Sequence, residues 1–420
     1  MGLRVKRSMG AIILLFVVLM ENCFYTVDAD AINVAGSIAY SDFWLVLFAL
    51  YFLWKFVKHI KTKVEYQHKY LILILCFFTL IAARQQAELT GQSFMLGLRP
   101  QRNYLIILLS YFPIRKLVHL GKLDKNQLFQ GFMVLGTFSG MLYIFQKLTY
   151  EHVQFIYTQT SHELGTLRMY LDTSLIQIAG LLAIYYFCKT FKIRYLIAYA
   201  INFLVIFWVG QGRLEIISYI AATVLGVLLM RKISNRRLVL LLIGMACVLV
   251  FMNTSYADKL WEAVMNAGTA TSEQGNTMEI RYLGRERYFS QLSESVSTFL
   301  FGCGYPNLLY VPAAHKAGFH LKMNLNDNGI FGYAYIYGIL GAAVIITVFV
   351  KMVKQAICVF KEKDNNFYLM YLALILVFAY NVIMWYWFAS GTFLLILLIC
   401  ILEDEFQKCR DTQIHKNEGE

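Results

Sequence analysis

Long apolar runs alternate with short charged segments along nearly the whole chain. A helix needs about 20 mainly apolar residues to cross a bilayer. Twelve runs bounded by charge approach this length, some of them only when aromatic residues at their ends are counted as interface anchors. The pattern predicts twelve membrane-spanning helices, at 9–26, 43–56, 70–83, 104–117, 128–146, 173–187, 195–209, 214–230, 238–251, 328–350, 367–385 and 391–402.

The composition agrees with this pattern. The chain of 420 residues is 59% apolar and 15% charged, with a mean hydropathy of +0.55, whereas soluble domains are near half apolar and a quarter charged. Twelve crossings use about 240 residues, which leaves no room for a separate soluble domain. We therefore expect an all-α polytopic membrane protein with one integral membrane domain over 1–420, an outer cap loop at 252–327 and a tail at 403–420.

The basic residues are distributed unevenly between the two sides. Twenty-six of the 38 lie in the N-terminal segment, the tail and every second connection between spans. Because cytoplasmic segments carry an excess of Lys and Arg, both termini are predicted to face the cytoplasm. The net charge of +12 is what this bias and an anionic inner leaflet produce, so no nucleic-acid partner is expected.

The N-terminal run has a second interpretation, and the cysteines suggest one pairing. Basic residues at 4–7 followed by Ala-Asp-Ala at 29–31 are also typical of a cleaved signal peptide, which leaves the remaining topology unchanged. Of the eight cysteines, only Cys23 and Cys303 are placed to meet on the outer side as a disulfide. No metal-ligand spacing occurs, so neither a metal nor another cofactor is expected.

Two outer connections are long enough to carry chemistry, 147–172 and 252–327. The second contains apolar residues at helical spacing and polar residues largely opposite them. The pattern predicts one amphipathic helix that ends at Gly302. Its apolar side holds Phe289, Leu292, Val296, Phe299 and Leu300, and its polar side holds Glu286, Ser290, Ser293 and Glu294.

Three arginines precede this helix. Arg281 and Arg285 are four positions apart, so they share one helix face, and Arg287 follows. Like charges at this spacing repel by roughly 0.2–0.5 kcal/mol, which an anion between them would relieve. The guanidinium group suits phosphate, and lipid pyrophosphate is the anion available at this depth. The alternative is a solvated set of charges offset by Glu279 and Glu286.

Two further outer arginines and an acid lie near span ends. Arg213 closes a tight Gly-Gln-Gly-Arg turn between the seventh and eighth spans, where it could clamp a leaving group or extend to the interface. Glu215 follows and can pair with it. Arg168 belongs to the 147–172 connection and is a candidate substrate-binding residue.

The start of the tenth span carries the candidate base. Asp327 could take the proton from a sugar hydroxyl, or it could serve as an N-cap. Asn324 lies three residues before it, and His320 is a weaker candidate of the same kind. Gly338, in the span, favours close helix packing.

Together these motifs resemble the O-antigen polymerase and O-antigen ligase superfamily of bacterial envelope assembly. The resemblance rests on twelve spans, a Gly-Gln-Gly-Arg turn, an arginine-led segment ending in FGCGY, and NDNGIFGYAYIYGILG before and within a span. It implies a GT-C-like glycosyltransferase bundle whose large outer loop lies between spans nine and ten. The implied reaction moves a glycan from undecaprenyl pyrophosphate onto another lipid-linked repeat unit, on the outer face of the cytoplasmic membrane.

The resemblance also implies roles and partners. Arg213 matches the turn arginine and Arg281 or Arg285 the loop arginine, both acting on the pyrophosphate. Asp327 stands where ligases carry a histidine, which argues against a ligase. The implied partners are the lipid-linked oligosaccharide, membrane lipids, and the chain-length regulator and flippase of the same pathway, with no nucleotide sugar or metal required. Candidate substrate-binding residues are Arg168, Glu215, Arg287, His320 and Asn324.

Two other classes remain alternatives. A many-span glycosyltransferase that uses polyprenyl-phosphate sugars would carry an acidic motif in the first outer loop, and Asp28-Ala29-Asp30 has that form. A lipid-oligosaccharide flippase or another transporter would place several charged residues deep in its spans. Glu215 is nearly the only acid close to one, which weakens the transporter class.

Overall fold

The structure is a computed structural model that describes residues 9–28, 40–163, 166–228, 277–362 and 389–417. These residues are mostly helical. The elements of the first half are α1 (Met9–Met20), α2 (Asn22–Tyr25), α3 (Tyr40–Lys58), α4 (Lys69–Thr90), α5 (Phe94–Leu98), η1 (Arg99–Gln101), α6 (Arg102–Leu109), α7 (Tyr111–His119), α8 (Lys125–Thr149), β1 (Thr160–Glu163), β2 (Thr166–Met169) and α9 (Ser174–Thr190).

The remaining elements complete the helical bundle. They are α10 (Ile193–Leu204), η2 (Val205–Gly210), α11 (Arg213–Leu228), α14 (Thr277–Leu292), α15 (Val296–Phe301), α16 (Val311–Lys316), η4 (Phe319–Leu321), η5 (Asn326–Asn328), α17 (Ile330–Glu362) and α19 (Ala389–Asn417). The strands β1 and β2 pair antiparallel, with Thr160 opposite Met169. The sequence pattern did not predict this hairpin.

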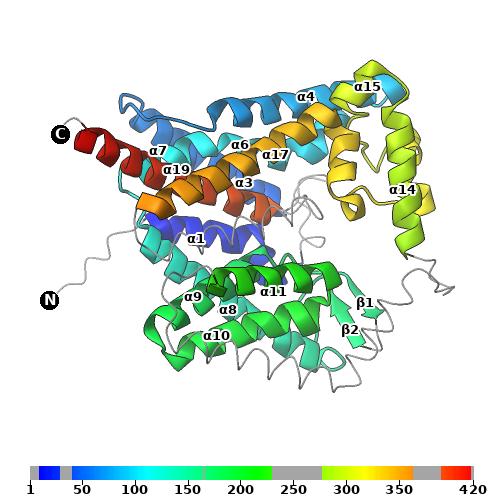
Figure 1. Ribbon diagram of the computed structural model, residues 1–420. Helices are drawn as coiled ribbons and strands as arrows, with labels where there is room; N and C mark the ends of the chain where they lie inside the picture. The colour runs from blue at the N-terminus through cyan, green and yellow to red at the C-terminus, as the bar shows by residue number, and fades with distance from the viewer. Residues whose placement is uncertain (1–8, 29–39, 164–165, 229–276, 363–388, 418–420) are drawn as a thin grey trace.

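The helices form two packed groups, which α1 and a direct contact between α9 and α19 join (Figure 1). One group contains α8, α9, α10 and α11, and the other contains α4, α6, α7, α17 and α19. The helix α1 packs on α3, α8 and α19, and its Ile13, Phe16 and Val17 are buried in the common core. Apolar burial between the helices is therefore continuous across the bundle.

Among the described residues, four helices are long and apolar enough to cross a membrane: Lys69–Thr90, Lys125–Thr149, Ile193–Gly210 and Ile330–Val359. Shorter apolar helices occupy Met9–Met20, Ser174–Thr190 and Glu215–Val227. The prediction of a helical membrane protein is thereby confirmed in its coarse form. The predicted spans at 238–251 and 367–385 lie outside the described residues.

Several predicted helices are interrupted. The span expected at 9–26 was too long, because α1 ends at Met20 and the residues of α2 have left-handed φ values. The span expected at 104–117 consists of α6 and α7, which meet at Ser110. The single amphipathic helix expected to end at Gly302 was wrong, because α14 ends at Leu292 and α15 starts at Val296. Ser295 accounts for the break, since its hydroxyl caps α15 in a reciprocal capping box with Thr298. The predicted end at Gly302 is confirmed.

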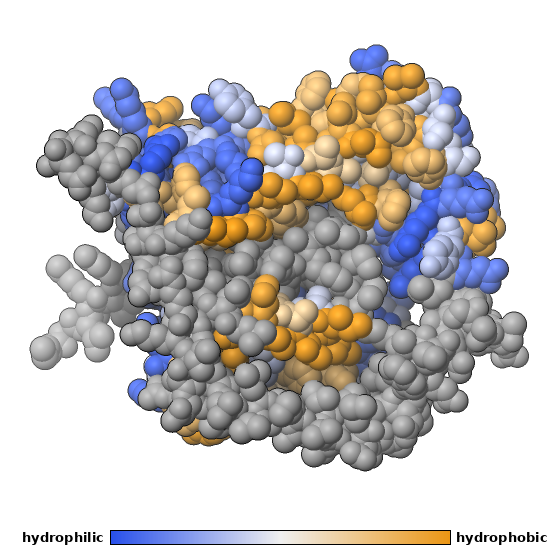
Figure 2. Space-filling model, viewed as in Figure 1, coloured by the Kyte–Doolittle hydropathy of each residue, from blue (hydrophilic) through white to orange (hydrophobic). Residues whose placement is uncertain are grey.

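The molecule has two distinct ends. At the tail end, the second half of α19 meets the connection that follows α3 and the start of α8, because Arg410 pairs with Glu65 and Lys125 pairs with Glu405. The hairpin β1–β2 and the helices α14–α16 lie at the opposite, hairpin end (Figure 1). Figure 2 shows hydrophobic residues over the middle of the group that contains α4 and α17, at the top of the view. Hydrophilic residues lie toward the tail end and over α14.

A buried ionic network anchors α19 at the tail end. Glu403 accepts hydrogen bonds from the backbone N of His68, at 2.7 Å, and from the hydroxyl of Tyr111, at 2.8 Å. Arg115 lies between two acids, with Nε 3.1 Å from Glu403 and Nη1 2.9 Å from Asp404. All five side chains are buried. His68 directly precedes α4, and Tyr111 and Arg115 belong to α7. This tail-end network therefore holds α19 to both helices.

A sharp kink in α17 receives the FGCG loop that follows α15. Gly338 has φ 73° and ψ 179°, so the helix breaks there. The backbone N–H groups of Cys303 and Gly304 donate to the carbonyls of Tyr335 and Ile336, at 2.6 and 3.2 Å. Cys303 is buried in this contact, and neither Cys303 nor Cys23 is in a disulfide, so the expected pairing of the two was wrong. The loop therefore replaces hydrogen bonds that the kinked helix cannot make internally.

Replacing Gly338 by alanine is expected to destabilise the protein by about 2 kcal/mol or more. Its backbone region is one that only glycine populates readily, and a Cβ there would lie 2.1 Å from the carbonyl oxygen of Leu300. Gly121 is the matched control, because it also has a positive φ of 64° but a Cβ added there would meet no atom within 4 Å. Thermal unfolding of both alanine variants in detergent tests this, and an equal loss for the two would contradict it.

Candidate functional site

The helix α14 places the arginines of the 252–327 connection at the hairpin end. Arg281 and Arg285 lie on this helix four residues apart, as the spacing predicted. The helix packs on η5 and on the first half of α17. Gly284 makes the approach possible, since a Cβ there would lie 3.1 Å from the side-chain amide nitrogen of Asn328. We call Arg281, Arg285, Asn324 and Asp327 the α14 site.

Arg285 is held over aromatic rings and has an unused donor. Its guanidinium carbon lies 5.3 Å from the ring centroid of Phe331 and 5.7 Å from that of Tyr282. Its Nε is buried and has no hydrogen-bond partner among the described residues. A buried donor without a partner costs free energy. An anion bound at this guanidinium group would satisfy the donor.

The short helix η5 presents Asp327 beside α14. The side-chain amide of Asn324 donates to Oδ2 of Asp327 at 3.3 Å, and the amide of Asn328 donates to the carbonyl of Asn324 at 3.0 Å. Gly329 directly precedes α17, so Asp327 is not the N-cap residue of that helix. The half-buried carboxylate remains available as an acceptor beside the arginine helix.

Buried tyrosines fix the start of α17. Tyr333 and Tyr104 share a hydrogen bond of 3.2 Å between their hydroxyls, and Tyr337 donates to Gln101 at 2.9 Å. Tyr335 donates to Gln291 of α14 at 3.1 Å. The three tyrosines of α17 therefore tie it to α6, η1 and α14, which holds η5 in place against the arginines.

Arg287 and His320 contact other parts of the cap. Arg287 donates through Nε to the carbonyl of Lys316, at 3.1 Å, and through Nη2 to that of His315, at 3.2 Å. These carbonyls end α16, where a cation is favourable. His320 is exposed, and its ring lies 4.4 Å from that of His315. Arg287 would have to give up both carbonyls to bind substrate through the same nitrogens.

Tyr288 links the charges of this region. It lies on the buried side of α14 and packs on Tyr335 of α17, with ring centroids 4.9 Å apart. Burial raises the pKa of Tyr288 well above its ordinary value; the positive charge of Arg287 opposes this shift and the negative charge of Asp327 adds to it. Both charges thus act on one hydroxyl, which stays protonated and can only donate or accept a hydrogen bond.

A second group of candidates lies at the hairpin. Nε of Arg168, on β2, donates to the carbonyl of Gly210 at 2.9 Å, and its guanidinium lies 4.5 Å from the ring centroid of Tyr170. Gly210 opens the Gly-Gln-Gly-Arg turn, in which Gln211 has a left-handed φ of 53°. The turn comes directly after η2, and α11 starts at Arg213. The side chain of Arg213 lies outside the described part of the chain.

Glu215 faces α9 from the first turn of α11. The side-chain amide of Gln177 donates to its Oε1 at 2.7 Å. The charges of Arg168 and Asp172 act on the same carboxyl group, so the three lie close together. The structure therefore brings Arg168, Glu215 and the Gly-Gln-Gly-Arg turn into one hairpin site. The α14 site lies at the same end of the molecule (Figure 1).

An open polar pocket beside the hairpin was not among the predicted sites. Its volume is about 520 Å³. Gln154, Tyr157 and Gln159 contribute amide and hydroxyl groups to its lining. Asp28 alone belongs to a predicted motif, the acidic one, and Asp30 of that motif lies outside the described residues. This hairpin pocket is lined by Asn22, Tyr25, Asp28, Gln154, Tyr157, Thr158 and Gln159.

The walls of the hairpin pocket are fixed by buried hydrogen bonds. Oε1 of Gln146 accepts from the backbone N of Phe155 and Ile156, at 2.6 and 2.8 Å, which sets the path of one wall. The backbone N of Tyr157 donates to the carbonyl of Tyr25 at 2.8 Å and joins the two walls.

The other wall is a left-handed turn. All four residues of α2 have φ between 49° and 61°. Such a turn costs roughly 1–2 kcal/mol per residue in non-glycine residues. Strained turns of this kind cluster at functional sites. The hydroxyl of Tyr25, on this turn, accepts a hydrogen bond from the backbone N of Asp172 at 2.9 Å, which places the pocket next to the hairpin site.

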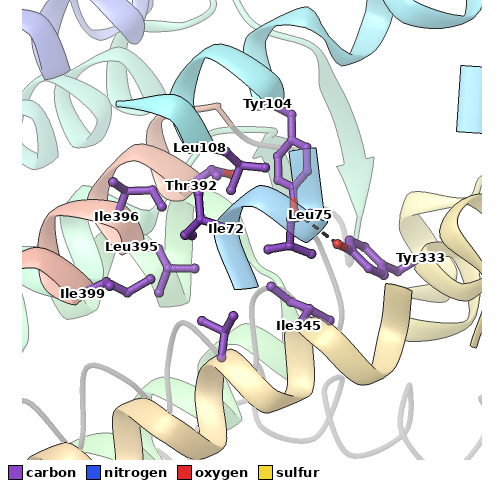
Figure 3. A pocket seen from close by; sticks show the side chains of 11 residues that line it. Ile72, Leu75, Tyr104, Leu108, Tyr333, Ile345, Thr392, Leu395, Ile396 and Ile399 are labelled. Carbon is purple, nitrogen blue, oxygen red and sulfur yellow. Dashed lines mark hydrogen bonds between the residues drawn. The ribbon is translucent and has the colours of Figure 1, made fainter. Parts of the chain in front are cut away.

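An apolar cavity between α4, α6, α17 and α19 is too small to hold a substrate (Figure 3). Its volume is about 20 Å³, the space of one or two water molecules. The hydrogen-bonded pair Tyr104 and Tyr333 bounds one end of it. Its other lining residues are Ile72, Leu75, Leu108, Ile345, Val348, Thr392, Leu395, Ile396 and Ile399.

Comparison with known proteins assigns no family. The chain matches no protein-family model and no curated protein. Within the described ranges, no three or more His, Cys, Asp or Glu side chains are placed to hold a metal ion. The geometry of the α14 site, the hairpin site and the hairpin pocket therefore carries the functional argument.

Proposed function

We propose that the protein is a glycosyltransferase that polymerises lipid-linked oligosaccharide units into a surface polysaccharide, on the outer face of a bacterial cytoplasmic membrane. The observation that carries the proposal is the α14 site. Two arginines share one helix face, one of them with a buried donor left open, and their helix packs on the short helix that presents Asp327.

The α14 site has the groups that this reaction requires. The hydroxyl oxygen of the acceptor sugar forms a bond to the anomeric carbon of the donor, and the bond from that carbon to the pyrophosphate oxygen breaks. Arg281 and Arg285 offset the negative charge that develops on the departing pyrophosphate. Asp327 takes the hydroxyl proton. In a partly dehydrated site such charge interactions are stronger than in water.

The hairpin pocket supplies a place for the sugar part of a substrate. Its lining offers amide, hydroxyl and carboxylate groups that match sugar hydroxyls, together with two tyrosine rings. No arginine or lysine is among its described lining residues, so it favours a neutral glycan over a phosphate. The proposal thus separates a basic site for pyrophosphate from a neutral pocket for glycan, both at the hairpin end.

Gel analysis of the surface glycan with and without the gene tests the proposed function. We expect a ladder of chain lengths in the parent strain and a single repeat unit, still exported, in the deletion strain. Repeat units that stay trapped inside would instead indicate a flippase. A full ladder left on the lipid carrier would indicate a ligase. An unchanged ladder would overturn the proposal.

A further inference from the structure

A cluster of basic side chains lies at the tail end, far from the candidate sites. Lys55 and Lys58 come from the last turn of α3, Lys116 comes from α7, and Lys122 follows α7. Nζ of Lys122 donates to Nε2 of His59, which is 63 positions away in the sequence. Partial burial and the charges of all four lysines lower the pKa of His59. The five side chains therefore converge on one place, which we call the lysine cluster.

The lysine cluster has no acidic counterpart among the described residues. None of its four lysines forms an ion pair within the described parts of the chain. Other cations at the same end do form them, since Lys125 pairs with Glu405 and Arg410 with Glu65. Uncompensated like charges that lie close together repel one another. A bound anion would remove that repulsion.

An apolar strip leads directly to the lysine cluster. Leu50, Leu53, Trp54 and Val57 follow helical spacing on one face of α3, and each is more than half exposed. Nζ of Lys55 and of Lys58 lies over the ring of Trp54, at 4.5 and 5.6 Å from its centroid. Tryptophan and lysine in contact at the end of an apolar helix are typical of the membrane interface. The surface thus combines an acyl-chain strip with a cationic end.

We propose that the lysine cluster and the strip on α3 bind one anionic phospholipid, with the phosphodiester between Lys58, Lys116 and Lys122 and an acyl chain along α3. Lys116 supports an anionic ligand, because it is only 3% exposed and a buried cation without an anion beside it costs free energy. Its Nζ lies over the ring of Phe56, 4.8 Å from the centroid. Clusters of basic side chains at the ends of membrane helices attract anionic lipid headgroups. This proposal is independent of the reaction at the hairpin end.

Binding of phosphatidylglycerol with a fluorescent acyl chain to the purified full-length protein tests the proposal. The variant is Lys58→Gln/Lys122→Gln, which removes two exposed lysines of the cluster. Each lysine near an anionic surface contributes about 1 kcal/mol, which equals about fivefold in Kd. We expect the Kd to rise on the order of 25-fold.

A matched control removes the same charge from the neighbouring connection between α3 and α4. Lys61→Gln/Lys63→Gln changes two lysines whose charges do not act on His59, and its Kd is expected to stay within about twofold of the parent value. Equal Kd values for the two variants would overturn the proposal. Both variants are compared by thermal unfolding in phosphatidylcholine, and equal unfolding temperatures show that any loss of binding is not a loss of fold.

Inorganic phosphate separates the two possible sources of the anion. Phosphate at about 50 mM gives an ionic strength of about 0.1 M, which screens exposed charges. If the strip on α3 takes part, this phosphate should leave most of the labelled lipid bound, and phosphatidylcholine should not displace it either. Complete displacement by phosphate at millimolar concentration would show a site for free phosphate and would overturn the lipid assignment.

Discussion

Replacing Arg285 by alanine is expected to reduce polymer formation by on the order of 100-fold or more, as judged by the glycan ladder in a complemented deletion strain. The guanidinium group is fixed over Phe331 and keeps a buried donor without a described partner. Removing it leaves the departing pyrophosphate with less charge compensation where water is partly excluded. Arg285→Lys should retain part of the activity, because lysine keeps the charge but loses the planar fork.

Arg84 provides the matched control for Arg285. It lies near the hairpin end of α4, its side chain is 78% exposed, and it pairs with Glu88 one turn later. Arg84→Ala removes one arginine from the same end of the molecule and should leave the ladder unchanged. A normal ladder from Arg285→Ala, at equal protein levels in the membrane, would exclude the role proposed for Arg285.

Replacing Arg115 by alanine is expected to lower the free energy of unfolding by about 3 kcal/mol, since it removes the one buried cation that two acids share. Those acids are Glu403 and Asp404, which are at most 5% exposed. After the change Glu403 keeps His68 beside it, and Asp404 keeps Lys408. Chemical unfolding of the purified protein in detergent, followed by tryptophan fluorescence, measures the loss. The amount of protein in the membrane should fall with it.

The exposed pair of Arg410 and Glu65 calibrates this result. Their side chains are 41% and 42% exposed, and exposed pairs contribute up to about 1 kcal/mol. Arg410→Ala should therefore lower the free energy of unfolding by no more than that. A similar loss in the free energy of unfolding for the two variants would mean that the buried tail-end network stabilises the protein no more than an exposed ion pair does.

The membrane character of the fold was predictable from the sequence, but its interruptions were not. Apolar runs predicted the helices that became α4, α8 and α17 to within a few residues at most ends. Composition could not show that α17 kinks at Gly338, because the kink depends on backbone donors from Cys303 and Gly304 in a different segment. The break before α15 could have been found, since Ser295 and Thr298 form a capping signal.

The candidate site was predictable where residues are close in sequence. Arg281 and Arg285 share a helix because their spacing is local, and that helix packs on η5, which carries Asp327. The hairpin pocket was missed because its walls, 22–28 and 154–159, meet only through tertiary contacts such as that from Tyr157 to Tyr25. Polar residues in two separate connections carry no local signal that they share one pocket.

The tail-end network also sets an order of assembly. Asp404 follows Arg115 by 289 positions in the sequence. The ribosome therefore makes α4 and α7 long before it makes the acids that neutralise Arg115. Until α19 is made, Arg115 lacks the two acidic partners that it has in the folded bundle. The helix α19 thus completes this network, and a chain cut before it would leave the Arg115 cation without its two acids.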